Sequence, residues 1–322
     1  MRIKHIDVLR GIAALLVTIF HLTGSSGLSK TAASAGKYGY VGVEMFFVIS
    51  GFILPYSMLK SNYKVRDFGK FMCKRVVRIY PAYIVAILLG IILPLLTGRQ
   101  LIPWLDIFTQ LTFANSFFHM DWVSAVFWTL SIEFQFYILI GLAFQAMSSS
   151  NAKSVMLILL VTVFSFFCNT RIMVFYWFPI FSLGLLIFNW RCLGMPKLHF
   201  WLGVAALVAL IAFVHGVPEA LASLFAVLFI AFVQLEVRTK ANRLFFFLGT
   251  ISYSLYLVHW EIGRAAVGFS RHIPVVGSSE IVRVTIGVLV SVLAGAILYH
   301  FVERRSVRLS SEIRYSKSEG EA

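Results

Sequence analysis

A few ionisable side chains lie inside long apolar stretches of this sequence. The first stretch carries Asp7, Arg10 and His21. Intervals of 3 and 11 residues return to the same side of a helix, so these three side chains share one face. A helix separates Arg10 from His21 by roughly 16 Å along its axis. A histidine titrates near neutral pH, so we interpret His21 as a candidate catalytic base.

Structural interpretations of the same face stay open. Asp7 and Arg10 can form an ion pair at the membrane surface that only fixes the helix. His21 can be a buried histidine that is hydrogen-bonded to a neighbouring helix.

Two carboxylates are candidates to orient His21 and stabilise its charged form. Glu133 lies in the fourth apolar stretch and shares a helix face with Tyr137, four residues later. Glu44 lies near the predicted outer end of the second stretch, as His21 does in the first. A carboxylate beside an imidazole fixes its tautomer. The alternative is that these carboxylates are hydrogen-bonded only for packing.

A further polar seam follows residues 245–267, where Ser252, Tyr256, His259 and Gly263 recur at helical spacing. We expect this seam to face the other helices, and we expect His259 and Tyr256 to support the site. The supporting set also includes polar and aromatic side chains near Glu133, namely Trp128, Ser131 and Tyr137.

Arg75 and Arg78 are three residues apart at the beginning of the third apolar stretch. Two guanidinium groups near a helix N-terminus suit a phosphate, because bidentate donors add to the favourable end of the helix dipole. The alternative is attraction to anionic lipid headgroups. The segment after this stretch contains four aromatic residues, Trp104, Phe117, Phe118 and Trp122. They can stack on sugar rings, or they can lie at the membrane interface without binding a ligand.

The elements that position these residues are membrane spans. Hydrophobic residues make up 59% of the 322 residues and charged residues only 13%, which excludes a soluble enzyme and a disordered chain. About ten stretches approach the roughly 20 residues that a helix needs to cross a bilayer. They are 6–25, 39–59, 74–97, 125–147, 153–169, 172–189, 199–215, 217–235, 245–267 and 282–303. The sequence thus predicts an all-α polytopic transmembrane helix bundle, with residues 101–120 as an interfacial loop.

The cations indicate the orientation of these spans. With both termini in the cytoplasm, about 20 of the 28 Lys and Arg residues fall on the cytoplasmic side. The net charge of +14 therefore reflects topology, and no nucleic-acid partner is expected. The three cysteines, Cys73, Cys168 and Cys192, are too scattered to predict a metal site.

At these residues the sequence resembles the membrane-bound acyltransferase-3 family, whose members mostly acylate extracytoplasmic glycans. Six motifs stand in family order along nearly the whole chain. They are Asp7–Ala14 running to His21, Gly42–Phe52, Arg75–Pro81, Trp128–Glu133, Ser252–His259 and Glu303–Arg304. Two positions differ from the usual pattern: Glu44 stands where Asp is more frequent, and Arg305 stands where Pro often follows.

The resemblance implies a ten-helix core, a catalytic His21 and a functional Arg75–Arg78 pair. It also implies acyl-CoA, most simply acetyl-CoA, as the cytoplasmic donor and a glycan such as O-antigen or exopolysaccharide as the acceptor. We expect residues 1–303 to form the acyltransferase domain in a bacterial inner membrane. Residues 304–322 would then be a short charged cytoplasmic tail.

The combined hypothesis is transfer across the bundle. The phosphates of acyl-CoA bind near Arg75, Arg78 and Arg10, and His21 acts on an acceptor hydroxyl that arrives from outside. A covalent acyl-histidine is a second route. A proton-coupled secondary transporter is the rival class, with His21, Glu133 and His259 as a proton relay. A structural scaffold would not need such side chains in the bilayer.

Overall fold

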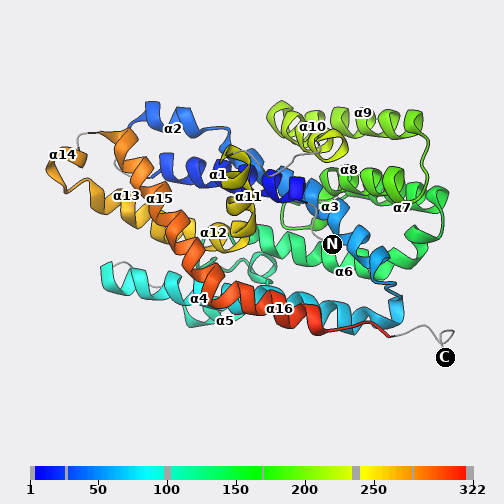
Figure 1. Ribbon diagram of the computed structural model, residues 1–322, viewed down its shortest axis with the longest axis horizontal. Coiled ribbons are helices and arrows are strands. Elements are labelled where there is room, and N and C mark those ends of the chain that lie inside the picture. The colour runs from blue at the N-terminus through cyan, green and yellow to red at the C-terminus, as the bar shows by residue number, and fades with distance from the viewer. Residues whose placement is uncertain are drawn as a thin grey trace. The chain divides into compact units, whose positions relative to one another are not determined.

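The computed structural model describes residues 4–25, 28–97, 103–168, 170–233, 240–277 and 279–316, and it is helical throughout (Figure 1). The first half contains α1 (Lys4–Thr23), α2 (Lys30–Gly36), η1 (Gly39–Val41), α3 (Gly42–Lys60), η2 (Val65–Asp67), α4 (Phe68–Thr97), α5 (Trp104–Gln110), η3 (Asn115–Phe118) and α6 (Trp128–Ser149). The second half contains α7 (Asn151–Ser165), α8 (Val174–Cys192), α9 (Lys197–Val214), α10 (Val217–Phe232), α11 (Lys240–Thr250), α12 (Ser252–Val258), η4 (His259–Gly263), α13 (Arg264–Ser270), α14 (Pro274–Gly277), α15 (Glu280–Leu298), η5 (Tyr299–Glu303) and α16 (Arg304–Glu312).

The all-α membrane fold is confirmed by these helices. Seven helical stretches of the described residues are long and apolar enough to cross a membrane, and each coincides with a predicted span. Two more predicted spans are the shorter apolar helices α7 and α10. The remaining one, 245–267, is divided into α11, α12, η4 and α13. The count of ten spans and the cytoplasmic location of the termini stay predictions.

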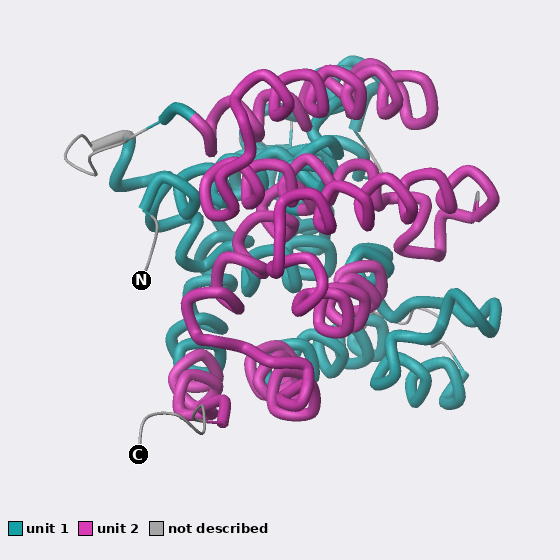
Figure 2. The backbone as a smooth tube through the Cα atoms, turned by 90° about the vertical axis from the view of Figure 1, so that its right-hand side faces the viewer, with its two compact units in different colours: residues 1–46, 81–130, 232–304 teal, residues 47–80, 131–231, 305–322 magenta. Residues whose placement is uncertain are grey.

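The chain forms two compact units, each assembled from three separate segments (Figure 2). Unit 1 comprises residues 1–46, 81–130 and 232–304. Unit 2 comprises residues 47–80, 131–231 and 305–322. Within α4 the change of unit falls at Pro81, which removes a backbone donor from the helix.

Unit 1 is built on the close packing of α1 against α11. A Cβ atom on Gly249 would lie 1.7 Å from the carbonyl oxygen of Asp7, and one on Gly11 would lie 2.2 Å from that of Phe245. Both glycines therefore let the two backbones touch, as small residues do between membrane helices. Residues 101–120, predicted to form a loop, contain only α5 and η3 in their described part.

Unit 2 is built on α3, α6 and α8. Gly51 and Gly184 place the backbones of α3 and α8 in contact, because a Cβ atom on either would lie within 2.2 Å of a carbonyl oxygen of the other helix. The fully buried ring of Phe181 stacks on Phe136 of α6 with ring centroids 4.1 Å apart. Phe47 of α3 stacks on the same ring at 4.6 Å. Aromatic stacking thus joins the three helices.

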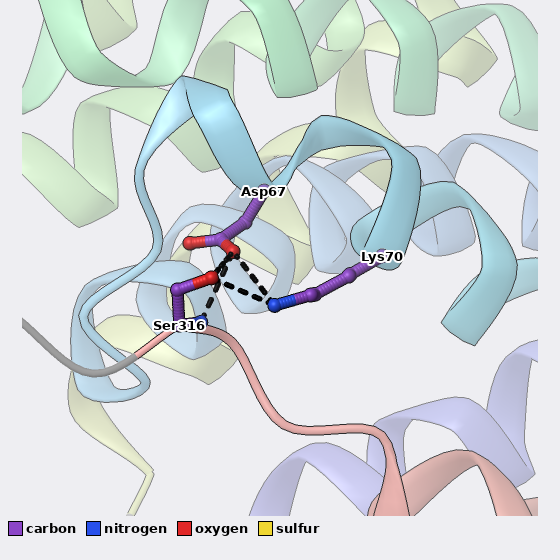
Figure 3. A network of polar contacts seen from close by, with 3 residues as sticks. All are labelled: Asp67, Lys70 and Ser316. Carbon is purple, nitrogen blue, oxygen red and sulfur yellow. Dashed lines mark hydrogen bonds and ion pairs between the residues drawn. The ribbon is translucent and has the colours of Figure 1, made fainter.

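The described part of the predicted tail belongs to unit 2, apart from its first residue, Arg304. Its first residues form α16, and the chain then reaches Asp67 (Figure 3). The backbone N–H and the hydroxyl of Ser316 donate to Asp67 Oδ1 at 3.0 and 2.8 Å. Lys70 Nζ lies 2.7 Å from Ser316 Oγ and 3.5 Å from the same carboxylate oxygen.

Candidate active site

His21 contacts a second histidine from a distant part of the chain. Its Nδ1 lies 2.8 Å from Nε2 of His259, and both residues belong to unit 1. His259 is fully buried, whereas His21 is partly exposed near the end of α1. The imidazole that can meet a substrate is therefore His21, and the ring behind it is shielded from water.

The backbone around His259 departs from a regular helix. The π turn η4 begins at this residue, directly after the short helix α12. Such turns interrupt α-helices frequently at functional sites. Nδ1 of His259 lies 2.8 Å from the carbonyl oxygen of Tyr256 and 3.2 Å from that of Leu255. The ring is thus held at one nitrogen by its own backbone and at the other by His21.

Glu303 fixes the beginning of α12. Its Oε2 accepts hydrogen bonds from the Ser254 hydroxyl at 2.6 Å and from the Ser254 backbone N–H at 3.2 Å. The carboxylate is buried at 5% exposure. Charge-assisted bonds to a backbone donor in the first helical turn are favourable, so Glu303 anchors the helix that carries His259. The resemblance includes Glu303, yet spacing alone offers no sign of this role.

An aromatic ring and a cation complete the surroundings of His21. The Trp260 ring meets His21 edge-on, with centroids 4.8 Å apart and planes at 84°. The guanidinium of Arg264 lies 4.3 Å from the centroid of the same Trp260 ring. Trp260 lies in η4 and Arg264 in α13. Neither is among the site residues predicted from the sequence. Their position within five residues after His259 is the sequence signal that could have identified Trp260 and Arg264.

Glu133, the first candidate partner of His21, lies in unit 2. Its Oε1 accepts the Tyr137 hydroxyl at 2.6 Å and the Ser50 hydroxyl at 3.1 Å. Glu133 and Tyr137 were predicted to share a helix face, and the structure shows a hydrogen bond between them. Glu44, the second candidate, is buried at 3% exposure on α3 and belongs to unit 1. An orienting role of either carboxylate toward His21 stays a prediction.

Arg75 is buried next to this carboxylate network in unit 2. Its guanidinium carbon lies 5.1 Å from the centroid of Phe71 and 5.5 Å from that of Tyr137. Its exposure is 9%, and its Nε has no hydrogen-bond partner in the described residues. Arg78 is half-buried one turn later. A buried guanidinium with an unused N–H is suited to receive an anion.

The remaining candidates divide between the two units. Asp7 and the half-buried Arg10 lie on α1, where Asp7 packs against the backbone of Gly249. The hydroxyls of Tyr256 and Thr129 are hydrogen-bonded at 2.7 Å within unit 1. Trp128 belongs to unit 1 and the buried Ser131 to unit 2. Among the predicted ionisable residues of unit 1, the structure brings His21 and His259 into direct contact. No group of three or more His, Cys, Asp or Glu residues that could hold a metal ion occurs in the described ranges.

The family of the chain follows from comparison with known proteins. A family model described as an acyltransferase domain matches residues 3–300, nearly the whole chain. The chain belongs to the acyltransferase-3 family. This confirms the resemblance: the chain carries the acyltransferase domain of this family. Seven apolar helices of span length, among the described residues, give the chain the character of a membrane protein.

Relatives of this acyltransferase carry related names. BcsY of Komagataeibacter xylinus, named as a membrane-bound transacylase, is 26% identical over 80% of this chain and 72% of its own length. YrhL of Bacillus subtilis (strain 168), named as a peptidoglycan O-acetyltransferase, is 29% identical. A protein of Acidianus two-tailed virus, named as an acetyltransferase, is 30% identical. The matches to YrhL and to the viral protein each cover 42% of this chain, but they cover only 23% and 38% of those two relatives. No solved structure matches the chain.

Proposed function

We propose that this acyltransferase moves an acyl group, in the simplest case acetyl, from cytoplasmic acyl-CoA to a hydroxyl of an extracytoplasmic glycan. The observation that carries the proposal is the position of His21. Its imidazole is partly exposed inside a membrane helix and is held at one nitrogen by His259. A positioned imidazole that retains a free nitrogen is the group that acyl transfer to a hydroxyl requires.

His21 acts as the general base of the transfer. It takes the proton of the acceptor hydroxyl while the hydroxyl oxygen attacks the thioester carbonyl. The new C–O bond forms, the C–S bond breaks, and the proton passes from His21 to the departing thiolate of coenzyme A. General base catalysis of this kind contributes about 100- to 10,000-fold to a rate.

The donor phosphates bind near Arg75 and Arg78. The buried guanidinium of Arg75, with an Nε–H that is unused in the described part of the chain, supports this role. Arg10 lies on the same face of α1 as His21 and is a further phosphate ligand. The excess of cations on one predicted side of the spans supports a donor that arrives from the cytoplasm.

The acceptor arrives at the opposite side of the bundle, which we assign to the outside of the bacterial inner membrane. The segment around α5 and η3 supports a glycan, since Trp104 and Phe118 are 78% and 63% exposed. Exposed aromatic rings can stack on sugar rings. The name of YrhL makes peptidoglycan one acceptor to test, beside O-antigen and exopolysaccharide.

Proteoliposomes test the proposal. The purified chain is reconstituted, [14C]acetyl-CoA is enclosed on one side, and peptidoglycan fragments or O-antigen oligosaccharide are added on the other. We expect label in the glycan without net flux of solute or protons. His21→Ala should reduce transfer by at least about 1,000-fold, whereas His199→Ala, at an exposed position of α9, should leave it unchanged.

Two outcomes would overturn or refine the proposal. Full transfer by His21→Ala, or proton-coupled uptake with no transfer, would contradict it. Label trapped on the protein in the absence of acceptor, and lost in His21→Ala, would support the route through an acyl-histidine.

A further inference from the structure

We propose that His259 is a positioning residue that fixes the tautomer of His21, so that Nε2 of His21 is the basic nitrogen. The inference deepens the proposed function and rests on it, because it names the atom that removes the proton. It also gives His259 the role of orienting His21, which was predicted from the sequence for Glu133 or Glu44.

The protonation of His259 follows from its backbone contacts. Nδ1 lies within hydrogen-bond distance of two carbonyl oxygens, those of Tyr256 and Leu255. A carbonyl oxygen can only accept a hydrogen bond, so Nδ1 of His259 carries the proton and donates it. The ring is fully buried, which disfavours its charged form. In the neutral ring one nitrogen donates and the other accepts, so Nε2 of His259 is an acceptor.

The tautomer of His21 follows from that of His259. The 2.8 Å contact joins Nε2 of His259 to Nδ1 of His21, and Nε2 accepts. Nδ1 of His21 must therefore donate, which leaves Nε2 of His21 with its lone pair. The ring centroids are 5.1 Å apart although the two nitrogens are only 2.8 Å apart, so the nitrogens lie between the centroids. The rings, whose planes differ by 27°, therefore meet nearly edge to edge. This is the arrangement of an in-plane N–H···N bond rather than of two stacked rings.

The continuous helical segment formed by α15 and η5 holds α12, and with it His259, in place. Glu303 binds the backbone N–H of Ser254 at the beginning of this helix. A Cβ atom on Gly295 of α15 would lie 2.9 Å from Cα of Leu255, so α15 presses directly on the backbone of α12. Leu255 and Tyr256 supply the two carbonyls. Their oxygens therefore cannot move without moving both helices, and the Nδ1–H of His259 keeps its direction.

The arrangement has a consequence for the reaction. When Nε2 of His21 takes the proton of the acceptor hydroxyl, its Nδ1–H already points at a basic nitrogen. The proton stays on Nδ1 of His21, because burial disfavours a charged His259, and the bond to Nε2 of His259 stabilises the positive charge of the His21 ring. Donation of the Nε2 proton of His21 to the thiolate restores the starting state. A carboxylate bound at Nε2 of His21 would occupy the nitrogen that the hydroxyl needs.

Replacement of His259 tests the inference through the separation of kcat from KM. The oxygen of His259→Gln can accept from Nδ1 of His21, whereas His259→Leu fills space but offers no acceptor. In the proteoliposome assay we expect His259→Leu to reduce kcat about 100-fold or more, with KM for acetyl-CoA changed by less than about 3-fold. His259→Gln should retain activity within about 10-fold of the wild type. Equal losses of kcat in both variants, or full kcat in His259→Leu, would overturn the inference.

A spectroscopic measurement keeps the test independent of activity and folding. In protein labelled with 15N-histidine, the signals of His21 are assigned by comparison with His21→Gln. We expect a protonated Nδ1 and an unprotonated Nε2 in the wild type and in His259→Gln, and a mixture of tautomers in His259→Leu. An Nε2–H tautomer in the wild type would overturn the inference. Failure of the proposed function can be told apart from failure of this inference. In the first case His21→Ala would remain active, whatever the tautomer of His21 in the wild type.

Discussion

The two compact units bury their polar groups in different ways. In unit 1, His21 and His259 are hydrogen-bonded to each other, and His259 is also bonded to backbone carbonyls, so the partners of His259 are neutral groups. In unit 2, the carboxylate of Glu133 and the guanidinium of Arg75 share one aromatic residue, Tyr137. The first arrangement suits the transfer of a proton. The second suits the binding of a charged ligand, because it contains a guanidinium group with an Nε–H that has no hydrogen-bond partner in the described residues.

The difference implies a division of labour that mutations can break. Substitutions at the histidine pair should act on kcat, and substitutions in the network of unit 2 should act on KM for the donor. Interactions that exist only in the transition state raise kcat, whereas uniform binding lowers KM.

The largest loss of stability and activity is expected at Gly249, where the backbones of α1 and α11 are in contact. A Cβ atom at Gly249 would lie 1.7 Å from the carbonyl oxygen of Asp7, so α1 and α11 must separate in Gly249→Ala. We expect a loss of about 3 kcal/mol in stability and loss of transfer, because α1 carries His21. Thermal unfolding in detergent measures the change. Gly268→Ala in α13 is the control, since no atom lies within 4 Å of its Cβ position. Equal midpoints for the two variants would contradict the packing of α1 on α11.

A smaller effect is expected for Tyr137→Phe, which removes one hydroxyl and keeps the ring beside Arg75. The hydroxyl donates to Glu133 at 2.6 Å. Hydrogen bonds to charged groups contribute about 1.5–3 kcal/mol, so KM for acetyl-CoA should rise about 10-fold with kcat within about 3-fold. Initial rates at varied acetyl-CoA give both constants. A fall in kcat at unchanged KM would instead place Glu133 in the chemistry of His21.

Arg75→Lys keeps the charge but loses the planar guanidinium that lies over Phe71 and Tyr137. Cation–π contacts contribute about 0.5–2 kcal/mol, so KM for acetyl-CoA should rise about 5-fold. The exposed Arg305→Lys in α16 provides a matched control in the same unit. The comparison between the units would lose its support if Arg75→Lys lowered kcat alone.

The smallest effect concerns the loop between α3 and η2. The pKa of Tyr63 is raised to about 12, mainly by burial and further by Tyr315 and Asp67. Its hydroxyl donates to the Gly141 carbonyl at 2.8 Å. Below pH 10 the folded and unfolded chains both keep this proton, so stability is unaffected. Above pH 10 the unfolded chain releases it first, and stability falls as the pH rises toward 12.

Thermal unfolding at pH 9 and 11.5 measures this loss. We expect Tyr63→Phe to have a lower midpoint at pH 9, because the hydrogen bond to Gly141 is absent. Its midpoint should then fall less between the two pH values than that of the wild type, by about 3 °C. An identical fall in both proteins would show that Tyr63 has the same pKa in the folded and unfolded chains, so that its burial does not raise the pKa.

Much of the fold could be predicted because a bilayer leaves few choices. A span must satisfy its backbone within one helix, so length and hydropathy suffice to find it, and seven predicted spans correspond to span-length helices. The division of 245–267 could not be predicted from hydropathy. Ser254 contacts Glu303, 49 residues further along the chain, and Leu255 packs against Gly295, 40 residues further along.

The candidate site shows the same limit. His21 stood out because an ionisable side chain in a span is costly, and Tyr137 was paired with Glu133 because residues four apart on a helix touch. His259, which contacts His21, is 238 residues away, so sequence spacing could not reveal this contact. The sequence by itself determined a helical membrane protein of the acyltransferase-3 family and a candidate base, His21. The tertiary structure decided which ring nitrogen of His21 meets His259, because contacts between distant helices depend on how those helices pack.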